Sequence, residues 1–377
     1  MSDARWMASA LALARRAVGG TAPNPAVGAI IVRDGIVLGR GVTAPGGRPH
    51  AETQALSQAN ERFGGSGGAT LYVTLEPCAH HGKTPPCADA VVDAGIARVV
   101  CPIGDPDPRV AGRGFSRLRD AGVTVDVGLM AHEARKVNAG FLSRIERNRP
   151  QILLKLATTL DGRIATRMGE SRWITGSAAR RQVHLMRAQA DAILIGAGTA
   201  RTDDPMLDVR DIGLAGRAPT RVVVDGSLSL SLSSRLVRTA RDVPLLILHR
   251  KAVDPERRRA FSDLGVTPIE VQDIDGQPDL QACLNLLAGD FGITRLMCEG
   301  GGRLAASLLK AGLVDEIALF QAGKMIGGDG TPSVQGFGLD ALGDAPGFRL
   351  EAVSLVGPDT LSLWMHSTSE QSKFGPV

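Results

Sequence analysis

The chain has 377 residues, of which 44% are hydrophobic and 22% are charged, and its formal net charge is +4. This length is typical of two globular domains, and the composition excludes a chain that is disordered throughout. The excess of positive charge is small and scattered, and the chain has only nine Phe, three Trp and one Tyr, so a nucleic-acid surface is not indicated.

The amino-terminal region contains a short apolar stretch within WMASALALARRAVGG, residues 6–20. This stretch is too short to cross a membrane, and it ends at an Arg pair where a signal peptide has small residues before its cleavage site. We therefore predict an amphipathic first helix, a cytoplasmic location and no membrane association. Five Cys in such a chain indicate free thiols or metal ligands rather than a disulfide framework.

The first half of the chain alternates strand-like and helical patterns. Two β-rich runs, 26–32 and 36–42, flank Asp34-Gly35, which is a tight hairpin signal. A helix is predicted to begin near His50, and strands then alternate with helices. The later strands are expected at 69–75, 97–103 and 123–129, and the last helix at 131–146. This order predicts an α/β sandwich with a sheet that is mostly parallel beyond the hairpin.

A charged, Pro-containing segment, RIERNRPQ at 144–151, predicts a linker between two domains. The second half alternates again, and its continuous apolar strands predict a sheet that helices cover on both faces. These strands lie within 152–162, 191–199, 220–226, 243–249, 293–302 and 315–320. We place the first domain at 1–146, the linker at 147–150, the second domain at 151–368 and a loose tail at 369–377.

Residues of the first half suit a catalytic zinc site. Such a site needs three protein ligands of the His and Cys type and keeps a fourth tetrahedral position open for water. His50, Cys78 and Cys87 supply these ligands. Zinc lowers the pKa of water toward neutrality. Glu52, two residues after His50, is a carboxylate outside the ligand set that can carry the proton to a leaving nitrogen. The two stretches concerned are PHAETQ (49–54) and LEPCAHHGKTPPC (75–87).

The spacing of the two Cys is unusual for such a site. Zinc deaminases carry H-x-E followed by P-C-x-x-C, whereas eight residues, AHHGKTPP, separate Cys78 from Cys87. From the residues alone, a structural zinc site closed by His80 or His81 and a pair of ordinary buried thiols are alternatives. The insertion is equipped to hold a polar, phosphorylated substrate through His80, His81, Lys83 and Thr84.

The remaining Cys and the prolines of the insertion carry local predictions. Pro85-Pro86 predicts a helix start at Cys87, and a thiolate is stabilised near the positive end of a helix. Cys101, Cys283 and Cys298 are isolated in apolar runs, so we predict that they lie in strands and belong to the core.

A run of glycines in the second half is a candidate phosphate-binding segment. In CEGGGRLAASLLKAGL (298–313), a strand end is followed by Gly300 to Gly302 and then by a helical pattern. Backbone N–H groups at such a helix start can bind a phosphate, although a simple tight turn is the alternative. The dinucleotide pattern G-x-G-x-x-G is absent.

A second stretch, DAILIGAGTARTDDPMLDVR (191–210), offers cofactor and phosphate contacts. Thr199 and the glycines before it suit a cofactor, while Arg187 and Arg210 suit a substrate phosphate. The alternative is a loop with capping Asp residues and solvated Arg side chains. Trp173, within SRWITG, suits either a core or a cofactor face.

Four motifs of the first half resemble those of the bifunctional deaminase/reductases of riboflavin biosynthesis, in their usual order: NPAVGAIIV, HAE, EPCAHHGKTPPC and GDPDPRVAGRG. The second half, with KLATTLDGRIA, is similar to the reductase domain of that family. The resemblance implies an amino-terminal cytidine-deaminase-like three-layer α/β/α domain and a carboxy-terminal dihydrofolate-reductase-like α/β domain. It implies zinc-dependent removal of the 2-amino group of a diaminopyrimidine ribosylamine phosphate, followed by NADPH-dependent reduction of the ribosyl group to ribityl.

The resemblance also implies roles for single residues. It assigns zinc to His50, Cys78 and Cys87, proton transfer to Glu52, and deaminase substrate contacts to Asn24 and His80. For NADPH it implies Ala157, Trp173, Thr199, Asp203 and the 301–307 loop with Gly301, Gly302, Arg303 and Leu304. For the reductase substrate it implies Ser171, Arg187, Leu207, Arg210 and Glu299. Candidates that assist proton transfer, or only position the reactants, are Lys155, Asp203 and Glu299.

Two positions depart from the family pattern. Thr43 stands where the family often has His, and Gly226 stands after Asp225 where Ser or Thr is more usual. We predict a cytoplasmic, homo-oligomeric two-step enzyme that uses Zn²⁺ and NADPH on a small phosphorylated pyrimidine and has no nucleic-acid partner. The rival interpretations are a tRNA adenosine deaminase fused to an unrelated α/β domain, and a non-enzymatic module with structural zinc.

Overall fold

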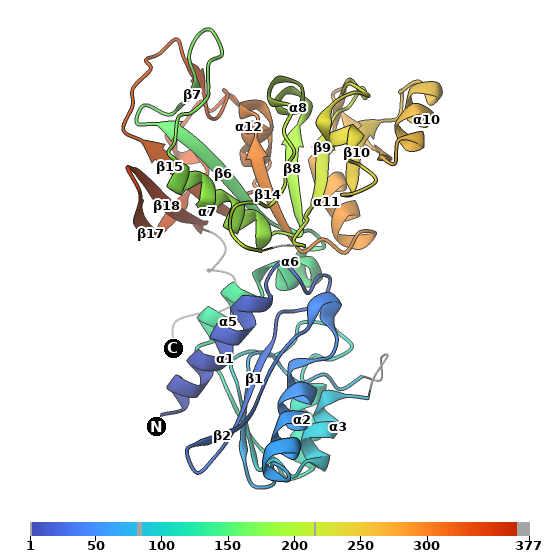
Figure 1. Cartoon of the computed structure of the whole chain (residues 1–377), viewed down its shortest axis with the longest axis vertical. Helices are drawn as coiled ribbons and strands as arrows, with labels where there is room; N and C mark the ends of the chain where they lie inside the picture. The colour runs from blue at the N-terminus through green and yellow to red at the C-terminus, as the bar shows by residue number, and fades with distance from the viewer. Residues whose placement is uncertain (1, 81–84, 215, 368–377) are drawn as a thin grey trace. The chain divides into compact units, whose positions relative to one another are not determined.

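The structure, a computed structural model, describes residues 2–80, 85–214 and 216–367. The chain divides into two compact units, Met1–Asn148 and Arg149–Val377 (Figure 1). This division lies inside the segment predicted as the linker, although helix α6 runs through Arg147. Within the described ranges, no helix combines the length and the apolar character needed to cross a membrane. The predicted loose tail, together with His81, Lys83 and Thr84, lies outside the described residues.

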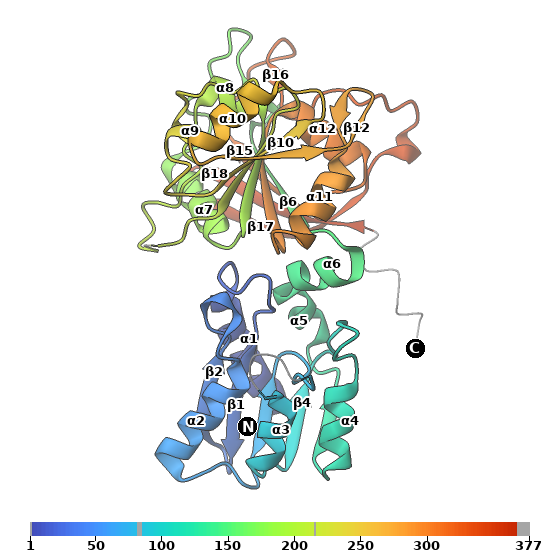
Figure 2. The same cartoon turned by 90° about the vertical axis from the view of Figure 1, so that its right-hand side faces the viewer.

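The first unit is a five-stranded sheet, in the order β2-β1-β3-β4-β5, with helices on both faces. Strands β1 and β2 form the predicted hairpin, β3 is antiparallel to β1, and β3, β4 and β5 are parallel. Helices α2, α3 and α4 cover one face, and α1 and α5 cover the other (Figures 1 and 2). The elements are α1 (Asp3–Ala17), β1 (Gly28–Arg33), β2 (Ile36–Val42), η1 (Pro45–Gly47), α2 (Ala51–Phe63), β3 (Thr70–Val73), α3 (Cys87–Asp93), β4 (Arg98–Cys101), α4 (Arg113–Asp120), β5 (Thr124–Val127), α5 (Ala131–Val137) and α6 (Ala139–Arg147).

Close packing of α2 on β2 positions the residues at the start of that helix. Gly39 and Gly41 face α2, and a Cβ at either position would overlap a backbone carbonyl oxygen of the helix, that of Ala55 or Ala51. The absence of a side chain lets the helix lie directly on the strand. Helix α2 begins immediately after His50, as predicted.

The predicted single helix over 131–146 is wrong, because the structure has two helices, α5 and α6, that meet at Asn138. The Asn138 side chain is buried, and its Oδ1 accepts a hydrogen bond of 2.9 Å from the backbone N–H of Ala26. The backbone of Asn138 departs from helical geometry, with φ at −99° and ψ at 14°, where this hydrogen bond holds its side chain, so the helix is interrupted there. The helical pattern of the sequence does not reveal this contact.

The second unit is built on a nine-stranded sheet, in the order β11-β10-β9-β8-β14-β6-β15-β18-β17. The strands from β11 to β15 are parallel, and β18 and β17 extend the sheet in antiparallel fashion. The elements are β6 (Gln151–Thr159), β7 (Arg163–Ala165), α7 (Ser177–Ala188), β8 (Ala192–Gly196), α8 (Ala197–Asp203), β9 (Thr220–Val224), α9 (Arg235–Arg238), β10 (Leu245–Arg250), α10 (Pro255–Asp263), β11 (Thr267–Val271), β12 (Asp273–Ile274), β13 (Gln277–Pro278), α11 (Leu280–Gly289), β14 (Arg295–Gly300), α12 (Gly302–Lys310), β15 (Glu316–Ala322), β16 (Thr331–Pro332), η2 (Leu342–Asp344), β17 (Phe348–Val356) and β18 (Asp359–His366).

Side chains of the parallel strands alternate between two hydrophobic cores. Along β8, Ile193 and Ile195 pack with residues of α9 and α10, whereas Leu194 packs with residues of α11 and α12. This alternation confirms the prediction of a sheet that helices cover on both faces. Cys101 and Cys298 are buried in strands, as predicted. Cys283 is also buried, but it lies in helix α11, so its predicted strand is wrong.

Enlarging Gly41 tests whether this packing positions the zinc ligands. Gly41→Ala should displace the start of α2, lower the free energy of unfolding by about 1–3 kcal/mol, and reduce the bound zinc. Urea unfolding and metal analysis of the full chain measure both effects. The matched control is Gly67→Ala, where a Cβ would contact nothing within 4 Å. Normal zinc content in Gly41→Ala would contradict the packing argument.

Candidate functional site

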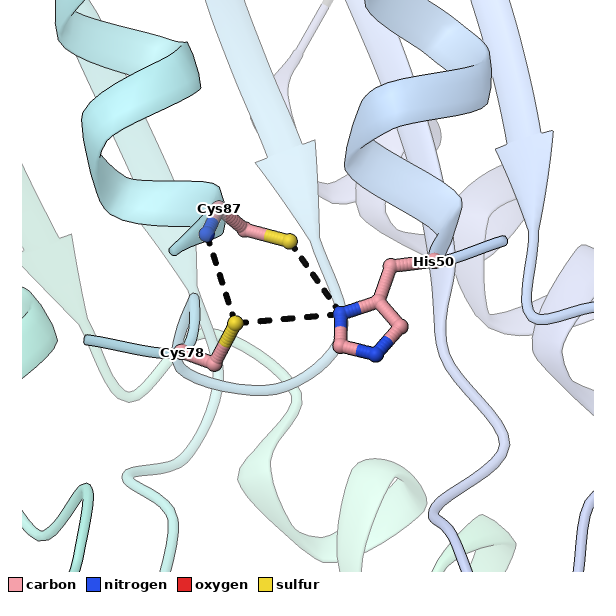
Figure 3. A group of neighbouring side chains, drawn as sticks. All are labelled: His50, Cys78 and Cys87. Atoms are coloured by element: carbon pink, nitrogen blue, oxygen red, sulfur yellow. Dashed lines mark hydrogen bonds between the residues drawn. The ribbon is translucent and has the colours of Figure 1, made fainter. Parts of the chain in front are cut away.

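Three side chains from three separate segments of the first unit converge on one point (Figure 3). His50 precedes α2, Cys87 begins α3, and Cys78 lies in the loop after β3. The His50 Nδ1 lies 3.2 Å from the Cys87 Sγ and 3.7 Å from the Cys78 Sγ. The predicted helix start at Cys87 is confirmed, with Pro86 at its N-cap.

The size of this cluster fits a tetrahedral zinc ion. The three ligand atoms all lie within 4.8 Å of one another. Ligands bound to zinc at about 2.0–2.3 Å are separated from one another by roughly 3.3–3.8 Å. Among the described residues, no fourth His, Cys, Asp or Glu joins the group. Within the described part of the chain, which does not include His81, the donor set is therefore that of an open catalytic site rather than a closed structural one.

The two thiols affect each other's ionisation. Hydrogen bonding from Cys87 lowers the pKa of the Cys78 thiol to about 4, and His50 also contributes to this decrease. The hydrogen bond to Cys78 and burial raise the pKa of the Cys87 thiol. A second thiolate beside the first is therefore unfavourable unless a cation compensates the charge, which agrees with a metal site.

Glu52 lies two residues after His50, in the first turn of α2, and is 4% exposed. Burial raises the pKa of its carboxyl to about 7, and the negative charge of Cys78 acts in the same direction. The carboxyl interacts with Cys87 but is not one of the three clustered ligands. Its position and its residue type suit a proton carrier beside the metal ligands.

The predicted substrate contacts of the first unit occupy two loops. Asn24 donates a hydrogen bond from Nδ2 to the carbonyl of Gly46 at 3.3 Å. The His80 Nδ1 is buried and has no hydrogen-bond partner in the part of the chain that the structure describes. Thr43, at a departure from the family pattern, is buried and accepts a hydrogen bond from the Val27 N–H at 2.9 Å, so its hydroxyl is used within the fold.

A charged cluster lies at the centre of the second sheet, where β6 and β14 are neighbours. The guanidinium of Arg187 forms a double hydrogen bond with the carboxylate of Glu299, with the Nη2 to Oε2 distance at 2.8 Å. Burial lowers the pKa of Lys155, whose ammonium is affected by the charges of Glu299, Arg187 and Asp203. The structure thus brings together four of the residues predicted for the reductase.

Most of the predicted cofactor residues follow the carboxyl ends of β8 and β14, whereas Ala157 lies in β6 and Trp173 in the loop before α7. Helix α8 begins directly after Gly196, and α12 begins at Gly302. Gly301 has a φ of 92°, and a Cβ there would lie 3.1 Å from the Thr199 Oγ1. The two helix starts therefore lie side by side at the edge where α/β sheets bind cofactors.

The other predicted residues of the second unit differ in exposure. Trp173 is 60% exposed, and the Arg180 guanidinium lies 4.5 Å from its ring centre. Arg210 pairs with Asp208 rather than projecting freely. At Gly226, the Arg250 Nε donates to the backbone carbonyl at 3.2 Å, so the side chain of Arg250 occupies the space beside this glycine. Leu207 and Leu304 are buried, Ala157 and Ser171 are half-buried, and Arg303 is exposed.

One buried group was not anticipated from the sequence. Glu76 accepts hydrogen bonds from four backbone N–H groups, those of Asp105, Gly112, Gly114 and Phe115. The sequence gives only a weak indication of this contact, which is a Glu immediately before Pro77-Cys78 and a glycine-containing loop about 30 residues later.

Comparison with known proteins finds relatives of both units. A family model described as RibD C-terminal domain matches residues 150–362, and one described as cytidine and deoxycytidylate deaminase zinc-binding region matches residues 1–103. The riboflavin biosynthesis protein RibD of Escherichia coli (strain K12) is 42% identical and covers 95% of this chain and 98% of its own. The RibD of Aquifex aeolicus (strain VF5) is 40% identical, and the match covers 95% of this chain and 96% of that protein.

Two solved structures share the whole fold. One form of Acinetobacter baumannii RibD has a TM-score of 0.87 at 36% identity and covers 97% of this chain and 99% of its own. A Thermotoga maritima diaminohydroxyphosphoribosylaminopyrimidine deaminase/5-amino-6-(5-phosphoribosylamino)uracil reductase has a TM-score of 0.84 at 32% identity and covers 96% and 98%.

The fold and the ligand cluster define a zinc-dependent deaminase unit joined to a reductase unit that uses NADPH. The chain belongs to the RibD family of riboflavin biosynthesis proteins. It is a bifunctional enzyme of that pathway and acts on a small pyrimidine, which confirms the predicted fold, activity and cofactors. The rival interpretations are not favoured, since the second half matches the RibD reductase domain rather than an unrelated one.

The Arg187–Glu299 pair should make the stability of the chain depend on pH. Burial alone would raise the pKa of Glu299, but the charge and hydrogen bonds of Arg187 lower it below the usual 4.5. The ionised pair therefore stabilises the fold fully above pH 4.5, and this contribution is lost as the pH falls through the lowered pKa. Glu299→Gln should cost about 3–5 kcal/mol at pH 7.

Urea unfolding of the wild type and of Glu299→Gln between pH 7 and pH 3 measures this effect. The difference in the free energy of unfolding should be constant down to about pH 5 and then decrease. Glu270→Gln, which removes the carboxylate of an exposed pair with Arg258 at 3.7 Å, serves as the control and should change stability by less than about 1 kcal/mol. A difference that grows on acidification would contradict the assignment.

Proposed function

We propose that the first unit deaminates 2,5-diamino-6-(5-phosphoribosylamino)pyrimidin-4(3H)-one and that the second unit reduces the ribosyl group of the product to ribityl. The name of the Thermotoga maritima relative states these two activities for that protein. The observation that carries the proposal is the cluster of one imidazole and two thiols with a buried carboxylate beside it. We further propose domain limits of 1–146 and 151–368, a cytoplasmic location, a homo-oligomeric state and no nucleic-acid partner.

In the first unit, His50, Cys78 and Cys87 would hold the zinc ion. When bound, zinc acts as a Lewis acid and lowers the pKa of a water molecule beside it. Glu52 accepts a proton from the attacking water and donates it to the departing amino nitrogen. Burial of Glu52 keeps this carboxyl away from bulk water, so the proton stays within the site. Asn24 and His80 orient the pyrimidine and its substituent.

In the second unit, NADPH supplies the reducing equivalent when bound. The residues proposed to hold it are Ala157, Trp173, Thr199, Asp203, Gly301, Gly302, Arg303 and Leu304. Those proposed for the substrate are Ser171, Arg187, Leu207, Arg210 and Glu299. The Arg187–Glu299 ion pair provides a rigid charged surface next to Lys155. Lys155 and Asp203 are the candidates for proton transfer to the opened sugar.

Sequential assays test both activities in one preparation. With the diaminopyrimidine substrate and zinc, the chain should release ammonia without NADPH, and NADPH added afterwards should be oxidised. Glu52→Gln should keep its zinc and lower ammonia release by about 10²–10⁴-fold, because the amide cannot carry the proton. Reduction of the deaminated intermediate should be unchanged in this variant.

The control for Glu52→Gln is Glu61→Gln, which alters an exposed carboxylate of the same helix. This control should retain zinc content and both activities. Unchanged ammonia release in Glu52→Gln would show that the carboxylate is not the proton carrier. Zinc loss in that variant would instead mean that Glu52 supports the metal.

The cofactor assignment can be tested at Gly301. Gly301→Val should weaken NADPH binding by at least about tenfold, since a branched side chain strains the positive φ and approaches Thr199. Titration of Trp fluorescence with NADPH measures the affinity. Gly312→Val places the same side chain at a glycine of positive φ just beyond the other end of α12 and should leave the affinity unchanged. Equal NADPH affinity in both variants would refute the assignment.

A further inference from the structure

Glu76 lies immediately before Pro77 and the ligand Cys78, and it is 3% exposed. One carboxylate oxygen accepts from the N–H groups of Asp105 at 3.0 Å and Gly112 at 3.1 Å. The other accepts from Gly114 at 2.9 Å and Phe115 at 3.2 Å. Hydrogen bonds to a charged acceptor are roughly twice as strong as neutral ones, so this contact is a strong one.

The four donors come from the two ends of one loop. Asp105 lies in the loop after β4, four residues beyond the end of that strand, and Gly112, Gly114 and Phe115 lie at the start of α4. Glu76 therefore closes the loop 105–112 at its base from a different segment of the chain. Gly114 permits this arrangement, because a Cβ there would overlap the Pro77 carbonyl oxygen and lie 3.1 Å from the Glu76 Cγ.

The closed loop forms part of the wall of a cavity of about 740 Å³. Arg109, Ala111 and Gly112 line it from the loop, and Ala79 and His80 line it from the segment after Cys78. Residues of α3 and α4 line the rest, whereas His50, Cys78 and Cys87 do not line it. The loop is also braced internally, since the Arg109 Nε donates to the Asp107 Oδ1 at 2.9 Å. The cavity therefore lies beside the metal cluster rather than around it, and Glu76 joins the loop to the segment that carries Cys78 and His80.

We infer that Glu76 is a positioning residue of the deaminase, which holds the loop 105–112 against the segment that carries Cys78 and His80. It keeps His80 and the loop in the arrangement that the substrate contacts, and it does not contact the reacting atoms itself. This inference rests on the proposed deaminase site, with His80 as a substrate contact. Loss of the Glu76 carboxylate should therefore affect substrate affinity far more than zinc content or turnover.

Glu76→Gln tests this role in the full chain. The amide NH₂ would face two backbone N–H donors and could accept from neither, so two of the four hydrogen bonds are lost. We expect the KM for the diaminopyrimidine substrate to rise by roughly 10- to 100-fold, while kcat changes little and zinc content is unchanged. The kinetics of the reductase with the deaminated intermediate should stay the same.

Asp3→Asn is the matched control in the same unit. Asp3 pairs with Arg98 at 2.8 Å and accepts a hydrogen bond from the Tyr72 hydroxyl at 2.6 Å, contacts that do not involve the loop 105–112. This variant should lose stability without a change in KM. An unchanged KM in Glu76→Gln, or a loss of zinc in proportion to kcat, would overturn the inference. Absence of ammonia release from the unaltered chain would instead refute the proposed function.

Hydrogen exchange gives a readout that does not depend on activity. In the unaltered chain, the amides of Asp105, Gly112, Gly114 and Phe115 should exchange slowly, although they lie at the ends of a loop. In Glu76→Gln these four amides should exchange faster while the strand amides of β3 and β4 stay protected. If this variant does not fold, the unaltered chain still tests the inference. Fast exchange of the four amides in that chain would rule out their hydrogen bonds to Glu76.

Discussion

The deaminase unit depends on the repulsion between two neighbouring thiolates, which a bound cation would remove. His50, Cys78 and Cys87 come from three separate segments, and their ligand atoms lie within 4.8 Å of one another. Ionisation of one thiol opposes ionisation of the other, since Cys78 raises the pKa of Cys87. The packing of α2 and α3 holds the three side chains together in spite of this repulsion. A divalent ion that binds both thiolates removes the repulsion and so links metal binding to the stability of the unit.

Both units place their functional residues where parallel strands end and helices begin. In the first unit, Cys78 follows β3, and His50 and Cys87 lie at the starts of α2 and α3 (Figures 1 and 3). In the second unit, α8 and α12 begin after β8 and β14. Helix starts offer free N–H groups and the positive end of the helix dipole, which favour thiolates and phosphates. One structural rule therefore serves a metal site and a cofactor site.

The two sites differ in how they balance buried charge. In the reductase unit, the positive Arg187 and the negative Glu299 form a direct ion pair, and Lys155 lies near both. In the deaminase unit, Glu52 is buried beside thiols, and burial raises the pKa of its carboxyl more than the nearby His50 lowers it. Burial favours the protonated form of a carboxylate, whereas a direct ion pair with Arg keeps it ionised. The environment of Glu52 therefore suits proton transfer, and the Arg187–Glu299 pair suits fixed recognition of a charged substrate.

Much of this protein follows from local sequence patterns. Several features are visible in the chain because they depend on residue type and short spacing. They are the hairpin at Asp34-Gly35, the helix start at Cys87, the parallel strands of both sheets and the choice of His50, Cys78 and Cys87 as a metal-type cluster. The break at Asn138, the helix around Cys283, the Arg187–Glu299 pair and the four N–H contacts of Glu76 are not visible.

The sequence by itself determined which chemical groups are present and the order of the elements that carry them. Only the tertiary structure decided which distant groups meet, as when Glu76 closes a loop that begins at Asp105. Local propensity acts over a few residues, whereas such contacts depend on how strands pair and helices pack across the whole sheet.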